Sequence, residues 1–223
     1  MSWPVEIDVS RRQFVRGLAW AGAALSTPAA IAETLTLTPS STEGPFYPDR
    51  LPLDTDNDLL IINDATTPAA GQVTHLGGRV LDSRGGPLRN AVVEIWQVDG
   101  HGVYLHTGSA GERRDANFQG YGRFLTGPDG QYYFRTVRPV RYPGRTPHIH
   151  FAVNRDGKRL LTTQMYIEGE PGNQRDGLYR SIRDERQRES VTVDFQKLPG
   201  ASADEFVAKF DIVLGLTPAD EAS

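Results

Sequence analysis

The stretch that decides the fold is residues 148–167, which read HIHFAVNRDGKRLLTTQMYI. Two strand-like segments, residues 148–153 and 160–167, flank a polar turn sequence at residues 154–157, Asn-Arg-Asp-Gly. A short Gly-containing turn between two such segments is typical of a β-hairpin. We therefore predict two antiparallel strands joined by a tight turn in this part of the chain.

Further strand-like segments lie on both sides of this hairpin. Residues 91–98 (AVVEIWQV) are rich in β-branched residues, and residues 131–137 follow a Pro-Asp-Gly turn. Strands are also expected at residues 76–81, 191–195 and 206–214, and one short helix near residues 177–184. Many short strands separated by Gly/Pro turns favour an all-β fold, a single-domain antiparallel β-sandwich with long loops and at most a short helix.

The first 32 residues resemble an export signal. Arg11 and Arg12 precede a moderately apolar stretch at residues 17–25, and residues 30–32, Ala-Ile-Ala, fit a small-residue cleavage site. We expect a twin-arginine signal at 1–32 and a periplasmic or secreted protein, the alternative being an amphipathic helix that packs on the domain. A loop-rich segment is expected at 33–75 and the β-sandwich catalytic domain at 76–223.

Composition narrows the classes of function. The net charge of the 223-residue chain is −4, which argues against nucleic-acid binding, and no segment after the signal is suited to span a membrane. The chain has no Cys, which excludes disulfides, thiol catalysis, iron–sulfur clusters and thiolate zinc sites. Any metal ligands must then be His, Tyr, Asp or Glu.

Two histidines in the hairpin are candidate metal ligands. His148 and His150 are two residues apart, so on a strand both imidazoles point to one face. Tyr142 lies just before them in a Pro/Gly-rich loop, and Tyr104 lies in a second polar-aromatic segment. Imidazole and phenol ligands without Cys suit a hard, oxidised metal, which would ionise a tyrosine at neutral pH. By themselves these residues also fit a hydrogen-bonded pair and buried core tyrosines.

Six motifs together resemble the intradiol ring-cleavage dioxygenases, the family of protocatechuate 3,4-dioxygenase and catechol 1,2-dioxygenase. The resemblance runs from about residue 41 to residue 170 and follows the family's order. The motifs are EGPFY at 43–47, EIWQ at 94–97, GVYLH at 102–106, NFQGYGR at 117–123, PHIHF at 147–151 and TQMY at 163–166.

The resemblance implies a mononuclear non-haem Fe(III) centre and a reaction. The substrates would be a small aromatic diol and O₂, the cleaved bond would join the two hydroxyl-bearing carbons, and the product would be a cis,cis-muconate. A protocatechuate-like diol is expected, and a homo-oligomer would be typical of the family. The implied residues are the ligands Tyr104, Tyr142, His148 and His150, with Tyr142 also accepting a diol proton, Arg145 beside the substrate ring, and Gln164 behind the ligands.

The loop before the histidines departs from the family pattern. Tyr142 and His148 are only six residues apart, and Gly144 stands where protocatechuate enzymes carry a Trp. The substrate is therefore open, and a hydroxyquinol, a lignin-derived diol or another metal is an alternative. A second alternative is a transthyretin-like β-sandwich binding module without iron, which would have no reason to keep the four ligands.

Several other histidines and tyrosines are not expected to be metal ligands. His75 and His101 are interpreted as loop residues, as is His106, which has a possible hydrogen bond near the site. The remaining tyrosines are assigned to core, surface or support roles, with Tyr47 as a less favoured candidate for the pocket mouth.

Overall fold

The computed structural model describes residues 35–63, 65–109, 114–201 and 204–216. These residues belong to one unit, Leu35–Ser223. The expected export signal at 1–32 lies outside the described residues, so it remains a prediction. No helix in the described ranges is long and apolar enough to cross a bilayer.

The first sheet is built around β1 (Val73–Leu81). One edge of β1 pairs antiparallel with β4 (Gln131–Val137), and the other edge pairs with two short strands in succession, β9 (Phe206–Lys209) and β10 (Ile212–Val213). β8 (Phe195–Lys197) completes this sheet by pairing with β9. The pairings of β1 with β9 and β10 are parallel, which differs from the wholly antiparallel arrangement expected from the sequence.

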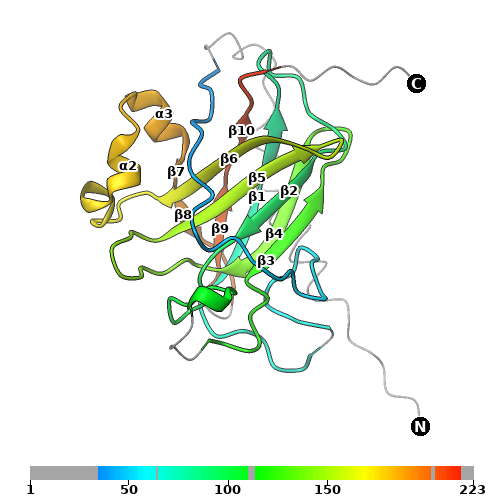
Figure 1. The fold of residues 1–223 in the computed structure, drawn as a ribbon, viewed down its shortest axis with the longest axis vertical. Coiled ribbons are helices and arrows are strands. Elements are labelled where there is room, and N and C mark those ends of the chain that lie inside the picture. Colours follow the sequence, from blue (N-terminus) through cyan, green and yellow to red (C-terminus); the bar gives the residue numbers. More distant parts are fainter. Residues whose placement is uncertain (1–34, 64, 110–113, 202–203, 217–223) are drawn as a thin grey trace. The chain divides into compact units, whose positions relative to one another are not determined.

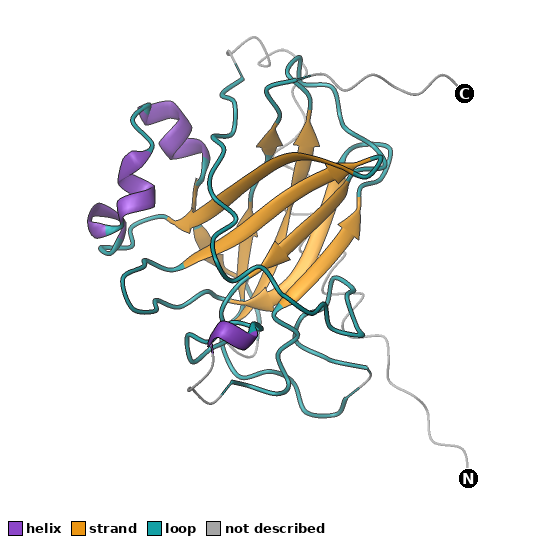
Figure 2. Cartoon of the chain, viewed as in Figure 1, coloured by secondary structure: helices purple, strands orange, loops and turns teal. Residues whose placement is uncertain are grey.

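The second sheet carries the predicted hairpin. Its order is β3 (Tyr121–Leu125), β2 (Val92–Trp96), β5 (His148–Arg155), β6 (Lys158–Ile167) and β7 (Thr192–Val193). All pairs are antiparallel except β6 with β7. Figures 1 and 2 show the two sheets as layers with loops gathered at their ends, which confirms the all-β fold with two sheets.

The core lies between the sheets. Phe151 of β5 contacts Tyr132 of β4 and Phe210 after β9, with ring centroids 6.0 and 4.9 Å apart. Phe124 of β3 similarly meets Phe134 of β4. These apolar side chains lie on the inward faces of their strands, as the period-two pattern of the sequence requires.

The hairpin prediction is confirmed. Asp156 and Gly157 form the turn with φ of 53° and 71°, and positive φ at both central residues matches the twist of the flanking strands. His148 pairs with Tyr166, and His150 pairs with Gln164. The hairpin therefore sets both histidines beside residues of the Thr-Gln-Met-Tyr motif.

The strand expected at 206–214 is split in two. The carbonyl of Phe210 would lie 1.8 Å from a Cβ added at Gly78, so the chain bulges close against β1 at a position without a side chain. Next to this bulge, Asp211 Oδ1 accepts the hydrogen bond of the Arg79 N–H at 2.9 Å, and the ladder is interrupted. The segment then resumes as β10.

Two short α-helices stand where the sequence predicted one. α2 (Gly177–Ser181) begins at Asp176, whose carboxylate accepts from the backbone N–H of Leu178 and Tyr179. α3 (Glu185–Ser190) begins at Asp184, which accepts from the Gln187 N–H in the same manner. Two 3₁₀ turns, η1 (Thr107–Ser109) and η2 (Asn173–Arg175), complete the helical elements.

The described chain before β1 is loop and runs over the second sheet. Ser41 N–H donates to Thr162 O at 2.8 Å, and Thr163 Oγ1 donates to Pro39 O at 2.8 Å. This segment, blue in Figure 1, crosses β6, and a Cβ added at Gly44 would lie 3.6 Å from Cε1 of His150 on β5.

Candidate functional site

His148 and His150 lie on one face of β5, both buried. Trp96 is paired with His150 across β2 and β5, and the two rings stack with centroids 4.8 Å apart and an interplanar angle of 11°. The backbone carbonyl of Thr146 accepts from Nδ1 of His148 at 2.7 Å. A proton on Nδ1 leaves the Nε2 lone pair of His148 free.

Tyr104 reaches the histidines from the loop after β2. The buried carboxylate of Asp99 accepts from the N–H groups of His101 and Val103 at 2.8 and 3.0 Å, which fixes this loop. Tyr104 Oη lies 3.0 Å from His150 Nε2 and 3.3 Å from His148 Nε2, and the two Nε2 atoms are 3.1 Å apart. Three ligand-type atoms therefore form a triangle of nearly equal edges.

This triangle fits a metal ion. Two ligands bound at about 2.1 Å and at roughly right angles stand about 3 Å apart, close to each edge observed. Burial lowers the pKa of His148 to about 4 and the pKa of His150 well below 6.5, so both imidazoles are neutral and present lone pairs. Nδ1 of His150 has no hydrogen-bond partner among the described residues. Among the described residues no three His, Asp, Glu or Cys side chains gather as a metal site, and Tyr104 Oη is the further ligand-type atom beside the two imidazoles.

Tyr142 joins the cluster from the loop before β5. Its ring centroid is 5.4 Å from that of Tyr104 and 5.6 Å from that of His148. A tight turn with Gly144 at φ 80° folds the loop back, so the Arg145 N–H donates to Tyr142 O at 3.0 Å. The structure thus brings together the four residues predicted as ligands.

Arg145 lies beside Tyr142 and is fixed by three partners. Its Nε donates to Asp176 Oδ2 at 2.8 Å, its Nη2 to Gln164 Oε1 at 2.5 Å, and its Nη1 to Tyr142 Oη at 3.5 Å. Burial lowers the pKa of Arg145, but the hydrogen bond and charge of Asp176 outweigh it and the pKa is raised. Gln164 Oε1 also accepts a hydrogen bond from Tyr166 Oη at 3.1 Å.

Sequence reasoning did not single out Phe46 and Asp176 as parts of the site. Phe46 stacks on Tyr104 with centroids 4.9 Å apart and meets Tyr142 edge-on. Its position in the Glu-Gly-Pro-Phe-Tyr motif is the signal that pointed to it. Asp176 had no signal, because a lone aspartate before a helix indicates a cap only.

Tyr47 and the three histidines that were not predicted as ligands lie outside the triangle. Tyr47 packs against Trp96, and its hydroxyl is directed at Glu94 at 3.4 Å. His106 faces Phe46, and its Nδ1 accepts from the Gly108 N–H. His75 lies in β1 and not in a loop, between Tyr133 and Glu205. His101 remains exposed beside Asp99.

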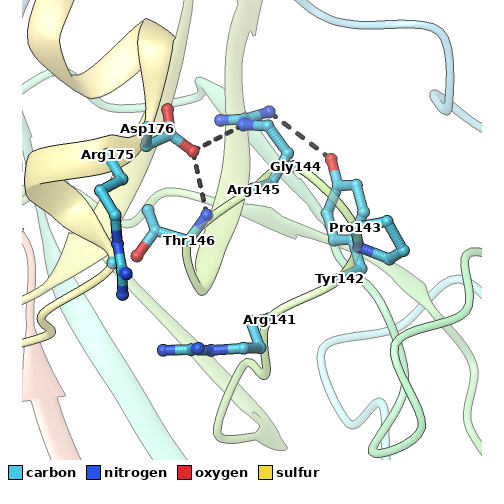
Figure 3. Close-up of a pocket in the computed structure, with 9 residues that line it drawn as sticks. Arg141, Tyr142, Pro143, Gly144, Arg145, Thr146, Arg175 and Asp176 are labelled. Carbon is cyan, nitrogen blue, oxygen red and sulfur yellow. Dashed lines mark hydrogen bonds and ion pairs between the residues drawn. The ribbon is translucent and has the colours of Figure 1, made fainter.

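A cavity of about 550 Å³ opens next to Tyr142 and Arg145. Figure 3 shows that the loop from Arg141 to Thr146 forms one wall, and that Arg175 and Asp176 form the other. This volume lies within the range of small-molecule sites. The arrangement provides a buried cluster of metal-ligand-type atoms, a cavity next to Tyr142, and the fixed positive charge of Arg145.

Comparison with known proteins finds similarity to ring-cleaving dioxygenases. The family model described as Dioxygenase matches residues 42–215. The β chain of protocatechuate 3,4-dioxygenase from Burkholderia cepacia is 37% identical over 145 residues, covering 60% of this chain and 54% of the relative. Catechol 1,2-dioxygenase from Acinetobacter baylyi is 32% identical over 175 residues, covering 70% and 53%.

A solved structure agrees with the sequence relatives. The dioxygenase domain of a dioxygenase–carbohydrate-binding fusion from Streptomyces sp. SirexAA-E superposes with a TM-score of 0.61 at 28% identity, covering 82% of this chain and all of that domain. The chain spans about half the length of the curated relatives it matches.

Proposed function

This chain belongs to the intradiol dioxygenase family, and from that premise we propose that it cleaves a catechol-type aromatic diol with O₂ between the two hydroxyl-bearing carbons. The product is a cis,cis-muconate-type diacid, in which both atoms of O₂ are retained and no further reductant is consumed. A protocatechuate-like diol is the proposed substrate, and small homo-oligomers are the proposed assembly.

The observation that carries this proposal is the triangle of Tyr104 Oη, His148 Nε2 and His150 Nε2. Its neutral nitrogens and phenol oxygen suit Fe(III), which supplies a Lewis acid and a template for both diol oxygens when bound. A transthyretin-like binding module has no need for such a buried, partly unsatisfied cluster next to a cavity.

The protein groups around the triangle have separate roles in the proposed reaction. Tyr142 is half-buried at the cavity wall, where its hydroxyl oxygen, once ionised by a bound Fe(III), would accept one diol proton. Arg145 stays protonated and stabilises negative charge that develops on the diol ring. Gln164 and Asp176 keep the Arg145 guanidinium in place through the contacts described above.

The test is product analysis with labelled oxygen. Purified, iron-loaded protein is incubated with ¹⁸O₂ and protocatechuate, catechol or hydroxyquinol, with a His148→Ala variant as the control. We expect one O₂ consumed per diol and two labelled atoms in the muconate, and no product from the variant that has lost its iron. Protein with one iron per chain that consumes no O₂ with any of the three diols would rule out the proposal.

A further inference from the structure

The cavity beside Tyr142 carries an excess of positive charge. Three guanidinium groups line it, those of Arg141, Arg145 and Arg175, whereas Asp176 is the carboxylate among its lining residues. The chain as a whole has a net charge of −4. Positive charge is therefore concentrated at this cavity against the overall balance.

Two of the three guanidinium groups already have partners. Arg145 uses Nε on Asp176, Nη2 on Gln164 and Nη1 on Tyr142. Arg141 donates from Nη2 to Glu170 at 2.8 Å. Each would have to give up a contact in order to bind a second anion.

The side chain of Arg175 is the exception. No hydrogen bond or ion pair joins its guanidinium to any residue within the described ranges, and the residue is exposed. In Figure 3 the Arg175 side chain extends past Thr146 and away from Asp176, along the wall that faces the loop from Arg141 to Thr146. The unpaired cation of the cavity is therefore Arg175.

The backbone that carries Arg175 is firmly held. Asn173, at the start of η2, is buried, accepts from Thr146 Oγ1 at 2.8 Å and donates from Nδ2 to Ile167 O at 2.8 Å. The Arg175 N–H donates to Gly172 O at 2.9 Å. The Cα of Arg175 is thus fixed relative to the loop of Tyr142 and Arg145, and only the charged end is free to meet a ligand.

We propose that Arg175 is the residue that recognises an anionic substituent, a carboxylate, on the ring of the diol. This inference rests on the proposed function, because it assumes that the two diol oxygens lie at the Tyr104–His148–His150 triangle. A guanidinium offers two parallel N–H groups that match the two oxygens of a carboxylate. Arg175 then selects carboxylated catechols over neutral ones, while Arg145 stabilises the negative charge on the diol ring.

The test measures binding apart from turnover. Isothermal titration of iron-loaded protein without O₂ gives the Kd for protocatechuate and the Kd for catechol in the wild type and in Arg175→Gln, Arg175→Lys and Arg180→Gln variants. Arg180 is an exposed arginine of α2 that does not line the cavity, so its variant controls for net charge.

We expect Arg175→Gln to raise the Kd for protocatechuate, relative to that for catechol, about fivefold, as suits a solvent-exposed charge pair. The lysine variant should keep most of the preference, and Arg180→Gln should leave the ratio as in the wild type. An unchanged ratio in Arg175→Gln, or an equal rise in Arg180→Gln, overturns the role of Arg175. Wild-type protein that binds neither protocatechuate nor catechol overturns both proposals. Wild-type protein that binds both diols and loses its preference for protocatechuate in Arg175→Gln, but forms no product, overturns the proposed function alone.

Discussion

The two candidate tyrosine ligands occupy different surroundings. Tyr104 is 3% exposed, and burial, followed by the neighbouring Tyr142, raises its pKa well above the ordinary value. Such a phenol ionises only beside a cation. Tyr142 instead lines the cavity, with Arg145 at its hydroxyl. This contrast supports Tyr142 as the tyrosine that receives the diol proton and Tyr104 as the permanent ligand.

The Tyr142→Phe substitution tests that assignment. Removal of the hydroxyl should leave folding and iron content intact but lower kcat about a hundredfold, the usual size of a general-base contribution. Stopped-flow measurement of anaerobic catechol binding should show a slower step. The matched control is Tyr133→Phe, whose hydroxyl contacts His75 in the other sheet. An unaltered kcat in Tyr142→Phe would contradict the base role.

Asp176 connects the site to the stability of the fold. Its carboxylate accepts from Arg145 Nε and from the N–H groups of Thr146, Leu178 and Tyr179. Burial raises the pKa of Asp176, but these donors outweigh it and leave the pKa below its usual value. Its stabilisation is therefore complete at neutral pH and is lost as the pH falls through its folded-state pKa.

The effect of Asp176→Asn on the free energy of unfolding should accordingly depend on pH. We expect a loss of about 3 kcal/mol in the free energy of unfolding at pH 7, since a buried charge pair is broken. The difference in the free energy of unfolding between the variant and the wild type should become smaller at low pH, where Asp176 itself becomes protonated. Urea denaturation at several pH values measures this, with the exposed Asp204→Asn as control. A gap that stays constant between pH 7 and pH 3 would be inconsistent with the charge argument.

At the scale of elements, the close approach of the Phe210 backbone to β1 depends on one glycine. A Cβ at Gly78 would lie 1.8 Å from Phe210 O, whereas at the neighbouring Gly77 the nearest atom lies 3.5 Å away. Because the obstacle at Gly78 is backbone, the strands themselves have to move to make room.

Gly78→Ala should therefore destabilise the protein by about 3 kcal/mol or more, and Gly77→Ala by less than about 1 kcal/mol. Urea midpoints of the two variants, compared with the wild type, test this directly. Similar midpoints for both variants would mean that the close approach of Phe210 does not constrain β1.

The elements that the sequence predicts are those specified locally. The β5–β6 hairpin is defined by its turn, and the i, i+2 spacing of His148 and His150 places both on one face. The split between β9 and β10 depends on a contact with Gly78, more than a hundred residues earlier in the chain, so no local pattern reveals it. Asp176 likewise reaches Arg145 only through the tertiary fold.

At the scale of the whole chain, the proposal that residues 1–32 direct twin-arginine export is independent of the fold. Lys substitutions at Arg11 and Arg12 keep the charge but remove the paired arginine motif. We expect the variant to accumulate in the cytoplasm of an expressing bacterium and the wild type in the periplasm, as measured by fractionation and blotting. Equal periplasmic amounts would argue against this route.

We propose that Tyr104, Tyr142, His148 and His150 hold Fe(III) and that a diol binds to it. The most direct measurement is the visible absorption spectrum and iron content of the purified protein, before and after anaerobic addition of catechol or protocatechuate. We predict one iron per chain and a tyrosinate-to-iron(III) band that shifts when the diol is added, with both lost in His148→Ala. A colourless protein that takes up no iron on reconstitution would contradict iron binding by these four residues.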